Sequence, residues 1–345
     1  MVRTSDISVI LQGPVREETR RAVQSVRSFL PGAEIILSTW LGEVLEDLGD
    51  DVRLVQATCP KAFVQHDRLK VLNNLNRLIR SSRLGLSEAT RPCILKMRSD
   101  LVLDSCAFLE TFEKYPKRGD SAVFKHRVLV PALFSRQGYR GSAAPFHLSD
   151  WAAFGLAEDV RLMFSGLPEV EEPEFTRWFE KNGRQSPYGA TLFRMAPEQY
   201  IIHGLYARTT GRSLMADAAD NGPEAVEASN RFIASNFTVA EYRDTGFRLP
   251  KYPASVDETK IGAEFFELWN KLTFERAYRE FCDPEHEITA KDEAELYLRR
   301  SQIAAKLRLV KHWERLTSPK SVLSIIEEIA VLPVVAVKYL LAHLY

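Results

Sequence analysis

The sequence CILKMRSD, residues 93–100, begins with three apolar residues and ends in a charged tip. A short run of bulky side chains that follows a helical pattern and a proline is typical of a buried strand in a mainly parallel sheet. Ligands of open α/β sheets bind beyond the carboxyl ends of the strands, where Arg98, Ser99 and Asp100 would lie. A carboxylate there can hold a divalent cation, which in turn can hold a diphosphate. Asp100 could equally cap the next turn or pair with a nearby base, so this stretch alone leaves both interpretations open.

Three earlier apolar runs, over residues 7–11, 34–37 and 52–55, also have the length and composition of strands. Between the first two, apolar residues recur at helical spacing over 22–30, and Pro31-Gly32 ends that pattern. A strand, a helix and a strand joined by tight links predict a right-handed parallel βαβ unit. We therefore expect an α/β fold of the Rossmann type, with a mainly parallel sheet flanked by helices.

Further elements follow from the spacing of apolar residues along the chain. Helical spacing over residues 67–80 and again over 84–89 predicts two helices before the strand at residue 93. Alternation of Phe146 and Leu148 predicts a strand that carries His147 on its opposite face.

The same spacing suggests how the chain divides into regions. A wide apolar face predicts a helix over residues 264–281. We expect an α/β domain over residues 1–230, a helical C-terminal region over 231–320 and an apolar tail over 321–345.

The composition of the 345 residues is that of an ordinary globular protein with no net charge, because Lys plus Arg and Asp plus Glu both number 46. A nucleic-acid-binding protein would normally carry a basic excess, so we expect no nucleic-acid partner. The four cysteines are scattered without the spacing of zinc ligands, which favours a reducing compartment and no disulfide framework. We expect no signal peptide at residue 1 and no segment that spans a bilayer.

Several sequence motifs of large enzyme classes are missing. There is no Gly-rich phosphate loop, no dinucleotide fingerprint, no Gly-x-Ser-x-Gly elbow and no zinc-binding His-Glu-x-x-His helix. Instead, polar residues stand in series at the predicted strand ends: Gln12-Gly13-Pro14, Ser38-Thr39-Trp40 and Arg98-Ser99-Asp100. Such a series suits a nucleotide-sugar site, with the base and ribose over the first strands and the diphosphate at the last.

The order and spacing of these motifs resemble the GT-A glycosyltransferases and, more closely, the WavE-type lipopolysaccharide and capsule biosynthesis family. The resemblance covers roughly residues 7–205 and rests on Gln12-Gly13-Pro14, Leu37-Ser38-Thr39-Trp40 with Gly42, Asn74-Leu75-Asn76-Arg77, Gly85-Leu86, Leu95–Asp100, His147–Trp151 with Gly155, and Pro197-Glu198-Gln199-Tyr200. It implies a GT-A-like fold and a bacterial enzyme that builds surface polysaccharide. Such an enzyme transfers sugar from a nucleotide diphosphate to a growing, lipid-linked glycan.

The resemblance also implies roles for single residues. The expected nucleotide-sugar-binding residues are Gln12, Gly13, Pro14, Thr39, Asn76, Arg77, Lys96 and Arg98. The expected ligands of a divalent cation, Mg²⁺ or Mn²⁺, are Asp100 and His147.

Arg98 stands where the general GT-A pattern has its first acidic residue. Asp100 alone could still hold the cation, because the substrate supplies phosphate oxygens. Alternatively, Lys96 and Arg98 could neutralise the diphosphate directly, since a guanidinium forks well onto phosphate. His147 could also bind a phosphate or serve as a buried structural histidine.

An inverting transfer needs a base that deprotonates the attacking hydroxyl, and Asp150 and Glu198 are the two candidates. Asp150 could instead cap the following segment or bind acceptor hydroxyls. Glu198 lies in the expected first turn of a helix, where an acidic residue is favoured by the helix dipole alone.

Two other functions remain possible: a non-catalytic scaffold of a polysaccharide assembly complex, and a nucleotidyltransferase that uses a similar sheet and cation. Basic residues from Lys306 to Lys320 precede the apolar segment 325–345, so the tail could bind the inner face of the cytoplasmic membrane. It could equally be a terminal helix packed on the main domain or on a second subunit. We expect a cytoplasmic protein that is either free or peripheral at that membrane.

Overall fold

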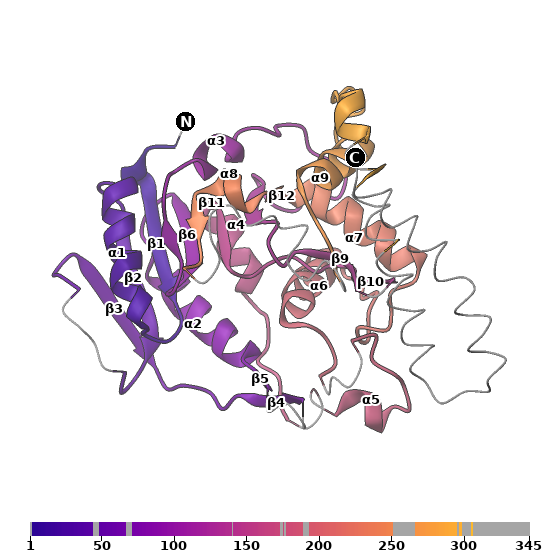
Figure 1. The fold of residues 1–345 in the computed structure, drawn as a ribbon. Helices are drawn as coiled ribbons and strands as arrows, with labels where there is room; N and C mark the ends of the chain where they lie inside the picture. The colour runs from indigo at the N-terminus through magenta and orange to yellow at the C-terminus, as the bar shows by residue number, and fades with distance from the viewer. Residues whose placement is uncertain are drawn as a thin grey trace.

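A mostly parallel sheet forms the centre of the chain. Its strands are β1 (Ile7–Gln12), β2 (Glu34–Trp40), β3 (Val52–Ala57), β6 (Cys93–Arg98), β8 (Val128–Pro131), β11 (Ala152–Leu156) and β12 (Phe237–Ala240). In the part of the chain that the structure describes, these seven strands have the order β12-β8-β11-β6-β1-β2-β3 (Figure 1). This computed structural model describes residues 2–43, 48–66, 71–139, 141–172, 175, 177–188, 193–250, 266–294, 297–298 and 305.

The strand directions bring most carboxyl ends to one edge of the sheet. β1 pairs in parallel with both β2 and β6, β2 pairs in parallel with β3, and β12 pairs in parallel with β8. β11 is antiparallel to both of its neighbours, β6 and β8. The residues just before β11 therefore meet the residues just after β6. This mixed α/β architecture agrees with the expected GT-A-like fold.

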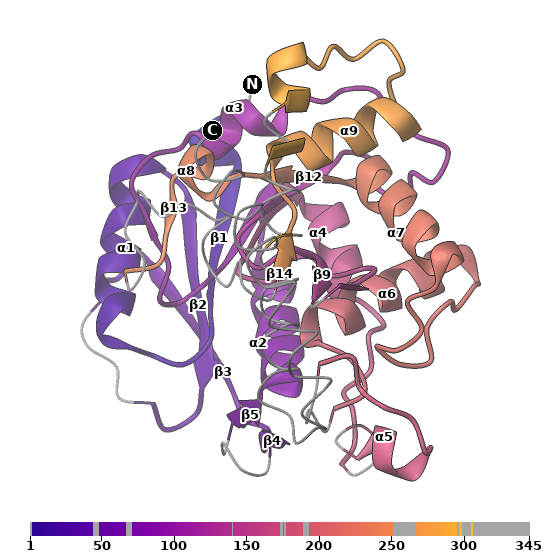
Figure 2. The same ribbon diagram turned by 45° about the vertical axis from the view of Figure 1, so that its right-hand side comes forward.

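Helices cover both faces of the sheet. They are α1 (Glu17–Phe29), α2 (Leu75–Glu88), α3 (Phe108–Phe112), α4 (Ala157–Phe164), α5 (Trp178–Lys181), α6 (Pro197–Thr210), α7 (Pro223–Asn236), α8 (Tyr242–Thr245) and α9 (Lys271–Phe281). Figure 2 shows α1 on one side of the sheet and α2, α4, α6 and α7 on the other.

Alternating side chains of β1 enter two separate cores. Val9 and Leu11 pack with Val23 of α1, whereas Ile10 packs with Leu75 of α2. A strand that is buried on both faces is rich in apolar residues on both, as residues 7–11 are apart from Ser8.

Short strands and one 3-10 turn complete the described structure. β9 (Arg136–Tyr139) pairs with β10 (Ser142–Ala143) and β14 (Phe266–Leu268), β7 (Val102–Leu103) pairs with β13 (Phe247–Arg248), and β4 (Phe63–His66) pairs with β5 (Val71–Asn73). A 3-10 turn, Thr4–Asp6, precedes β1. None of the helices in the described ranges has both the length and the apolar character needed to cross a bilayer.

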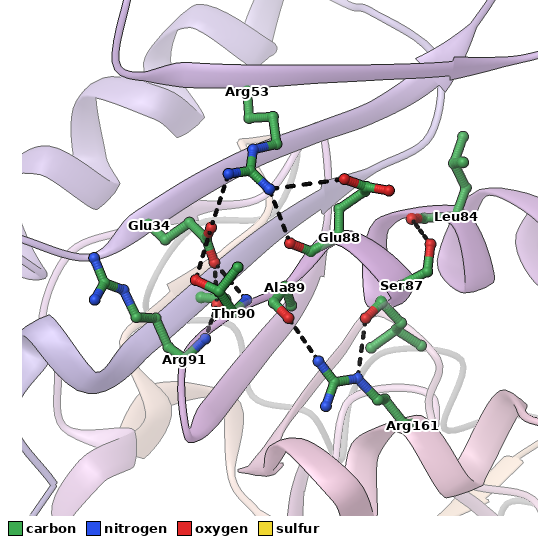
Figure 3. Close-up of polar contacts among 11 residues, drawn as sticks. Glu34, Arg53, Leu84, Ser87, Glu88, Ala89, Thr90, Arg91 and Arg161 are labelled. Carbon is green, nitrogen blue, oxygen red and sulfur yellow. Dashed lines mark hydrogen bonds and ion pairs between the residues drawn. The ribbon is translucent and has the colours of Figure 1, made fainter.

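The loop that leads from α2 into β6 is fixed by side chains of neighbouring elements (Figure 3). Glu34 accepts hydrogen bonds from the Thr90 amide at 2.9 Å and the Thr90 hydroxyl at 3.1 Å. Arg53 donates to the Glu88 carbonyl at 3.1 Å, and Arg161 donates to the Ala89 carbonyl at 2.6 Å. These contacts from β2, β3 and α4 fix the entry of β6 into the sheet, and therefore the position of its charged end at the opposite edge.

The helices expected before β6 are arranged differently. Residues 67–70 lie outside the described residues, and β5 and one continuous α2 stand where two helices were predicted. The Asn73 side chain accepts the Leu75 amide at 2.9 Å, which forms an Asx turn directly before α2. Gly85 lies inside the continuous α2. A Cβ at this position would lie 2.4 Å from a methyl carbon of Ile10. Gly85 instead lets the helix pack closely on β1.

The strand predicted around Phe146 is absent from the described structure, and β11 begins at Ala152 instead. Phe146 has a φ of 57°, which is incompatible with a strand. Its amide donates to the Ser229 hydroxyl at 2.6 Å, and the Ser149 amide donates to the Ser135 hydroxyl at 2.8 Å. Side chains therefore take the backbone donors that a strand would use.

The expected boundary at residue 230 falls inside α7, and β12 extends the central sheet beyond it. The helix expected over 264–281 is also shorter, because β14 precedes it and Asn270 caps α9 by accepting the Thr273 amide at 3.0 Å. The segment 321–345 lies outside the described residues.

Candidate functional site

A cavity of about 380 Å³ lies at the carboxyl ends of β1, β2 and β6. This volume falls within the range usual for small-molecule sites. The lining residues are Gln12, Gly13, Pro14, Arg16, Trp40, Glu43, Cys59, Asn74, Arg77, Leu78, Arg98, Ser99, Asp100 and Asp150. Most of them follow strands of the central sheet, where the sequence predicted a ligand site.

The turn after β1 brings two chain segments together at the cavity. Gly13 has a φ of 124°, which an L side chain rarely adopts, and a Cβ there would lie 3.3 Å from the Ser99 hydroxyl. The Ser99 hydroxyl donates to the Pro14 carbonyl at 2.7 Å, and the Ser99 amide donates to the Gln12 carbonyl at 2.9 Å. The glycine thus permits the close contact that joins the ends of β1 and β6.

Arg98 and Asp100 form a bidentate ion pair at the end of β6. Arg98 Nε lies 2.8 Å from Asp100 Oδ1, and Nη2 lies 2.6 Å from Oδ2. Arg16 Nη1 approaches the same carboxylate at 3.7 Å. Burial alone would raise the pKa of Asp100, but the hydrogen bonds and charge of Arg98, with the charge of Arg16, outweigh it and lower this pKa. Asp100 therefore stays ionised, holds the Arg98 guanidinium in a bidentate pair and attracts that of Arg16.

The formal charges that line the cavity balance. Three arginines, Arg16, Arg77 and Arg98, face three carboxylates, Glu43, Asp100 and Asp150. A diphosphate that entered this cavity would need additional positive charge, which a divalent cation would supply. Among the described residues, no three His, Cys, Asp or Glu side chains gather in a group that could hold a metal ion by themselves. Both carboxylate oxygens of Asp100 accept hydrogen bonds from Arg98, so a cation bound there would share them with the guanidinium.

The structure brings Arg77 to the cavity but not Asn76. Arg77 donates to the Pro60 carbonyl at 2.9 Å and to the Asn74 side chain at 3.1 Å. Asn76 instead exchanges two hydrogen bonds with the Val170 backbone, at 2.7 and 2.9 Å. It ties α2 to a neighbouring loop and does not line the cavity.

Of the predicted residues on β1 and β2, Gln12 lines the cavity and Thr39 does not. Gln12 Nε2 donates to the Ser81 hydroxyl at 2.7 Å, and Ser81 donates in turn to the Arg77 carbonyl at 2.6 Å. Thr39 is fully buried, and the next residue, Trp40, lines the cavity in its place.

Some lining residues were not selected from the sequence. These include Arg16, Trp40, Glu43 and Cys59. Arg16 and Trp40 had a usable signal, because each stands within or beside a polar segment at a predicted strand end. Glu43 and Cys59 lie in loops, where spacing gives no such signal.

Lys96 lies inside the protein and not in the cavity lining. Its side chain is fully buried, its Nζ donates to the main-chain carbonyl of Asp150 at 2.5 Å, and it stands 5.6 Å from the ring centre of Phe164. Burial lowers the pKa of Lys96 to about 8, against the opposing effect of the Asp150 charge. In this structure Lys96 therefore contacts Asp150 and not the space where a diphosphate would bind.

The two base candidates are close enough to interact, but only Asp150 lines the cavity. Glu198, in the first turn of α6, has a side chain that is 17% exposed. Burial, and secondarily the charge of Asp150, raise the pKa of Glu198. Glu198 therefore feels the charge of Asp150 but does not itself line the cavity.

His147 lies beside Glu198 and does not line the cavity that contains Asp100. Its ring is fully buried, and Nε2 is 4.0 Å from Glu198 Oε2, beyond hydrogen-bond distance. Burial, and secondarily the charge of Arg136, lower the pKa of His147 well below its usual value, so the ring is neutral. The structure does not bring His147 and Asp100 together around one cation.

The sequence model of one protein family, described as WavE lipopolysaccharide synthesis, matches residues 7–312 of the chain. A search of curated proteins found none that matches this chain. The match includes every residue of the cavity and every strand of the central sheet.

Proposed function

The chain belongs to the WavE lipopolysaccharide synthesis family, and from this membership we propose that it is a glycosyltransferase that uses a nucleotide-diphosphate sugar. Membership implies a part in lipopolysaccharide synthesis, with sugars and glycans as partners. The observation that supports transfer from a nucleotide donor is the cavity at the carboxyl ends of β1, β2 and β6, where Arg16 and Arg98 flank Asp100. The proposed acceptor is a growing, lipid-linked surface glycan.

The proposed donor lies with its diphosphate beside Arg16 and Arg98 and its nucleoside over the ends of β1 and β2. A guanidinium carries five N–H donors, and the bidentate pair with Asp100 uses two of those on Arg98. Planar guanidinium groups bind phosphate oxygens well, and the bidentate pair with Asp100 limits the rotation of the Arg98 guanidinium before the donor arrives.

We keep a divalent cation, Mg²⁺ or Mn²⁺, in this proposal because the charges of the cavity lining balance without a ligand. Asp100 would hold the cation together with phosphate oxygens of the donor. When bound, the cation would offset the negative charge of the leaving diphosphate. At this end of the site the protein would bind the diphosphate with Arg16 and Arg98 and the cation with Asp100.

Asp150 is the proposed base of an inverting transfer, because it lines the cavity and Glu198 does not. The acceptor hydroxyl attacks the anomeric carbon, and the bond between this carbon and the diphosphate oxygen breaks. Asp150 takes the hydroxyl proton, and the bond electrons leave with the nucleoside diphosphate. The glycan is then one sugar longer, and the nucleoside diphosphate is the second product.

The donor should first be found by a thermal-shift screen of nucleoside diphosphates and nucleotide sugars, each with and without Mn²⁺. A ligand that binds the folded state stabilises it by mass action. Turnover of the identified donor should then be compared in Asp150→Asn and Glu198→Gln, with donor affinity measured separately by calorimetry.

We expect Asp150→Asn to retain donor affinity and to lose transfer by roughly a hundred- to ten-thousand-fold, as for removal of a general base. Glu198→Gln should lose much less. The reverse ranking would make Glu198 the base. Normal transfer by both variants would exclude both residues and favour a retaining mechanism. A wild-type protein that binds donor but never cleaves it would favour the scaffold function.

A further inference from the structure

Lys96 is a buried cation in the middle of the central sheet. It lies on β6 opposite Ala153 of β11, and its side chain is fully buried. The space around it is bounded by Leu148, Ala153, Met163, Phe164, Ile201 and Ile202, together with Ser149 and Asp150. An ammonium in such surroundings loses its hydration, which is costly unless a polar partner compensates.

The polar partner of Lys96 is the main-chain carbonyl of Asp150, at 2.5 Å. Asp150 precedes β11, so the ladder of the sheet does not fix this carbonyl. The neighbouring backbone is held on each side: the Ser149 amide donates to Ser135, and the Arg98 amide donates to the Trp151 carbonyl at 3.0 Å. Lys96 supplies the contact at Asp150 itself.

Stability alone does not explain a lysine at this position. Replacing a buried charge by an apolar side chain of similar volume is often neutral or stabilising. Methionine is unbranched, has a similar length and would suit the apolar neighbours on α4 and α6. A lysine here is therefore better explained by what its hydrogen bond does to Asp150.

We propose that Lys96 is a positioning residue, which holds the Asp150 backbone so that the carboxylate of Asp150 remains at the cavity. This inference rests on the proposed function, because it assigns to Lys96 an effect on the transfer step through Asp150. The sequence suggested that Lys96 neutralises the diphosphate directly. In the proposed role Lys96 instead contacts the main chain of the proposed base, Asp150.

The test is Lys96→Met, with Leu95→Met as the matched control. Leu95 is the adjacent buried residue of β6, in the core on the opposite face of the sheet, so its variant reports repacking of the strand alone. We expect Lys96→Met to keep the melting temperature and nucleoside diphosphate affinity of the wild type and to lose turnover by about ten- to a hundred-fold, as for a displaced catalytic group. Leu95→Met should keep near-normal turnover.

A double-mutant cycle with Asp150→Asn separates positioning from a merely structural role. If Lys96 acts through Asp150, adding Lys96→Met to Asp150→Asn should change turnover by less than about twofold, because interacting residues are not additive. A second full loss in the Asp150→Asn background would overturn the inference. So would an equal loss of donor affinity and turnover in Lys96→Met alone.

Hydrogen exchange without substrate tests the same contact independently of activity. Amides in residues 148–151 should exchange faster in Lys96→Met than in the wild type or in Leu95→Met. Unchanged exchange would refute the positioning role even if turnover fell. A wild-type protein that transfers no sugar from any donor would instead refute the proposed function and, with it, the catalytic part of this inference.

Discussion

Replacing Asp100 by asparagine tests the site where the structure is most specific. The variant keeps the size of the side chain but removes the charge that pairs with Arg98 and Arg16. Removing one partner of a buried ion pair costs about 3–5 kcal/mol. The Asp100 side chain is 9% exposed, but that of Arg98 is 28% exposed, so water can partly solvate the orphaned guanidinium. We therefore expect about 2–3 kcal/mol of lost stability, below the range for a fully buried pair.

The pH dependence of this loss has a definite sign. The pKa of Asp100 is lower in the folded protein than its ordinary value, so the folded state favours the ionised form. The stabilisation is fully present above the unfolded pKa of about 4 and is lost as the pH falls through the lower folded value. The difference in stability between wild type and Asp100→Asn should therefore be full at neutral pH and should shrink in acid.

Urea denaturation at pH 7 and at successive acidic pH values measures this difference. Asp6→Asn is the matched control, because Arg3 and Asp6 form the same bidentate pair, at 2.9 and 3.1 Å, on the exposed surface. The free energy of unfolding of Asp6→Asn should be almost that of the wild type. Transfer activity should fall about a hundred-fold or more in Asp100→Asn, as for loss of a strong electrostatic stabiliser. Near-normal activity, or a stability loss no greater than that of Asp6→Asn, would refute our account of the site.

Three further predictions concern other parts of the chain. Gly85→Ala should destabilise the protein by about 1–3 kcal/mol in urea denaturation, because the clash with Ile10 exceeds the gain in helix propensity of about 1 kcal/mol. A stabilised variant would contradict the close packing of α2 on β1. A nucleoside diphosphate should raise the melting temperature more with Mn²⁺ than with a chelator, and this difference should vanish in Asp100→Asn. If the wild type shows the same shift with Mn²⁺ and with the chelator, a cation held by Asp100 is excluded. Truncation before Ser321 should abolish sedimentation with anionic vesicles at low salt, because it removes the apolar segment 325–345 that would bury in the interface and leaves the basic residues of 306–320 without that anchor. A full-length protein that ignores such vesicles would make the tail a structural element.

The strands nearest the site could be predicted because their burial leaves a direct mark on the sequence. β1, β2 and β6 are buried on both faces, so each reads as a continuous apolar run that ends in polar residues. The expectation that these polar ends meet at one sheet edge is confirmed by the parallel registers.

Elements fixed by distant side chains could not be predicted in this way. Phe146 looks like a strand residue, but its backbone is set by Ser229, a residue 83 positions away in the chain. α2 starts at Leu75, after an Asx turn in which the Asn73 side chain accepts the Leu75 amide, whereas the spacing of the leucines alone suggested an earlier start. Local periodicity does not record such contacts.

The candidate site shows the same division. Gln12, Arg77, Arg98, Asp100 and Asp150 were selected from the sequence and line one cavity. The surroundings of Lys96 and His147 depend on how α4 and α6 pack against the sheet, and a single strand pattern cannot distinguish a lysine that faces a ligand from one that faces a neighbouring backbone. The roles of all these residues remain predictions.

The late position of β11 in the chain has a consequence for how the sheet is assembled. β1, β2, β3 and β6, with α1 and α2, are complete by residue 98, whereas β11 begins at residue 152 and β12 at residue 237. During synthesis β6 can pair with β1 on one side, but its other edge stays open until more than fifty further residues have emerged. Open apolar edges can pair with other chains, and pairings between distant residues form slowly. β11, which directly follows the Asp150–Trp151 segment at the candidate site, thus also covers an edge of the sheet that would otherwise stay open.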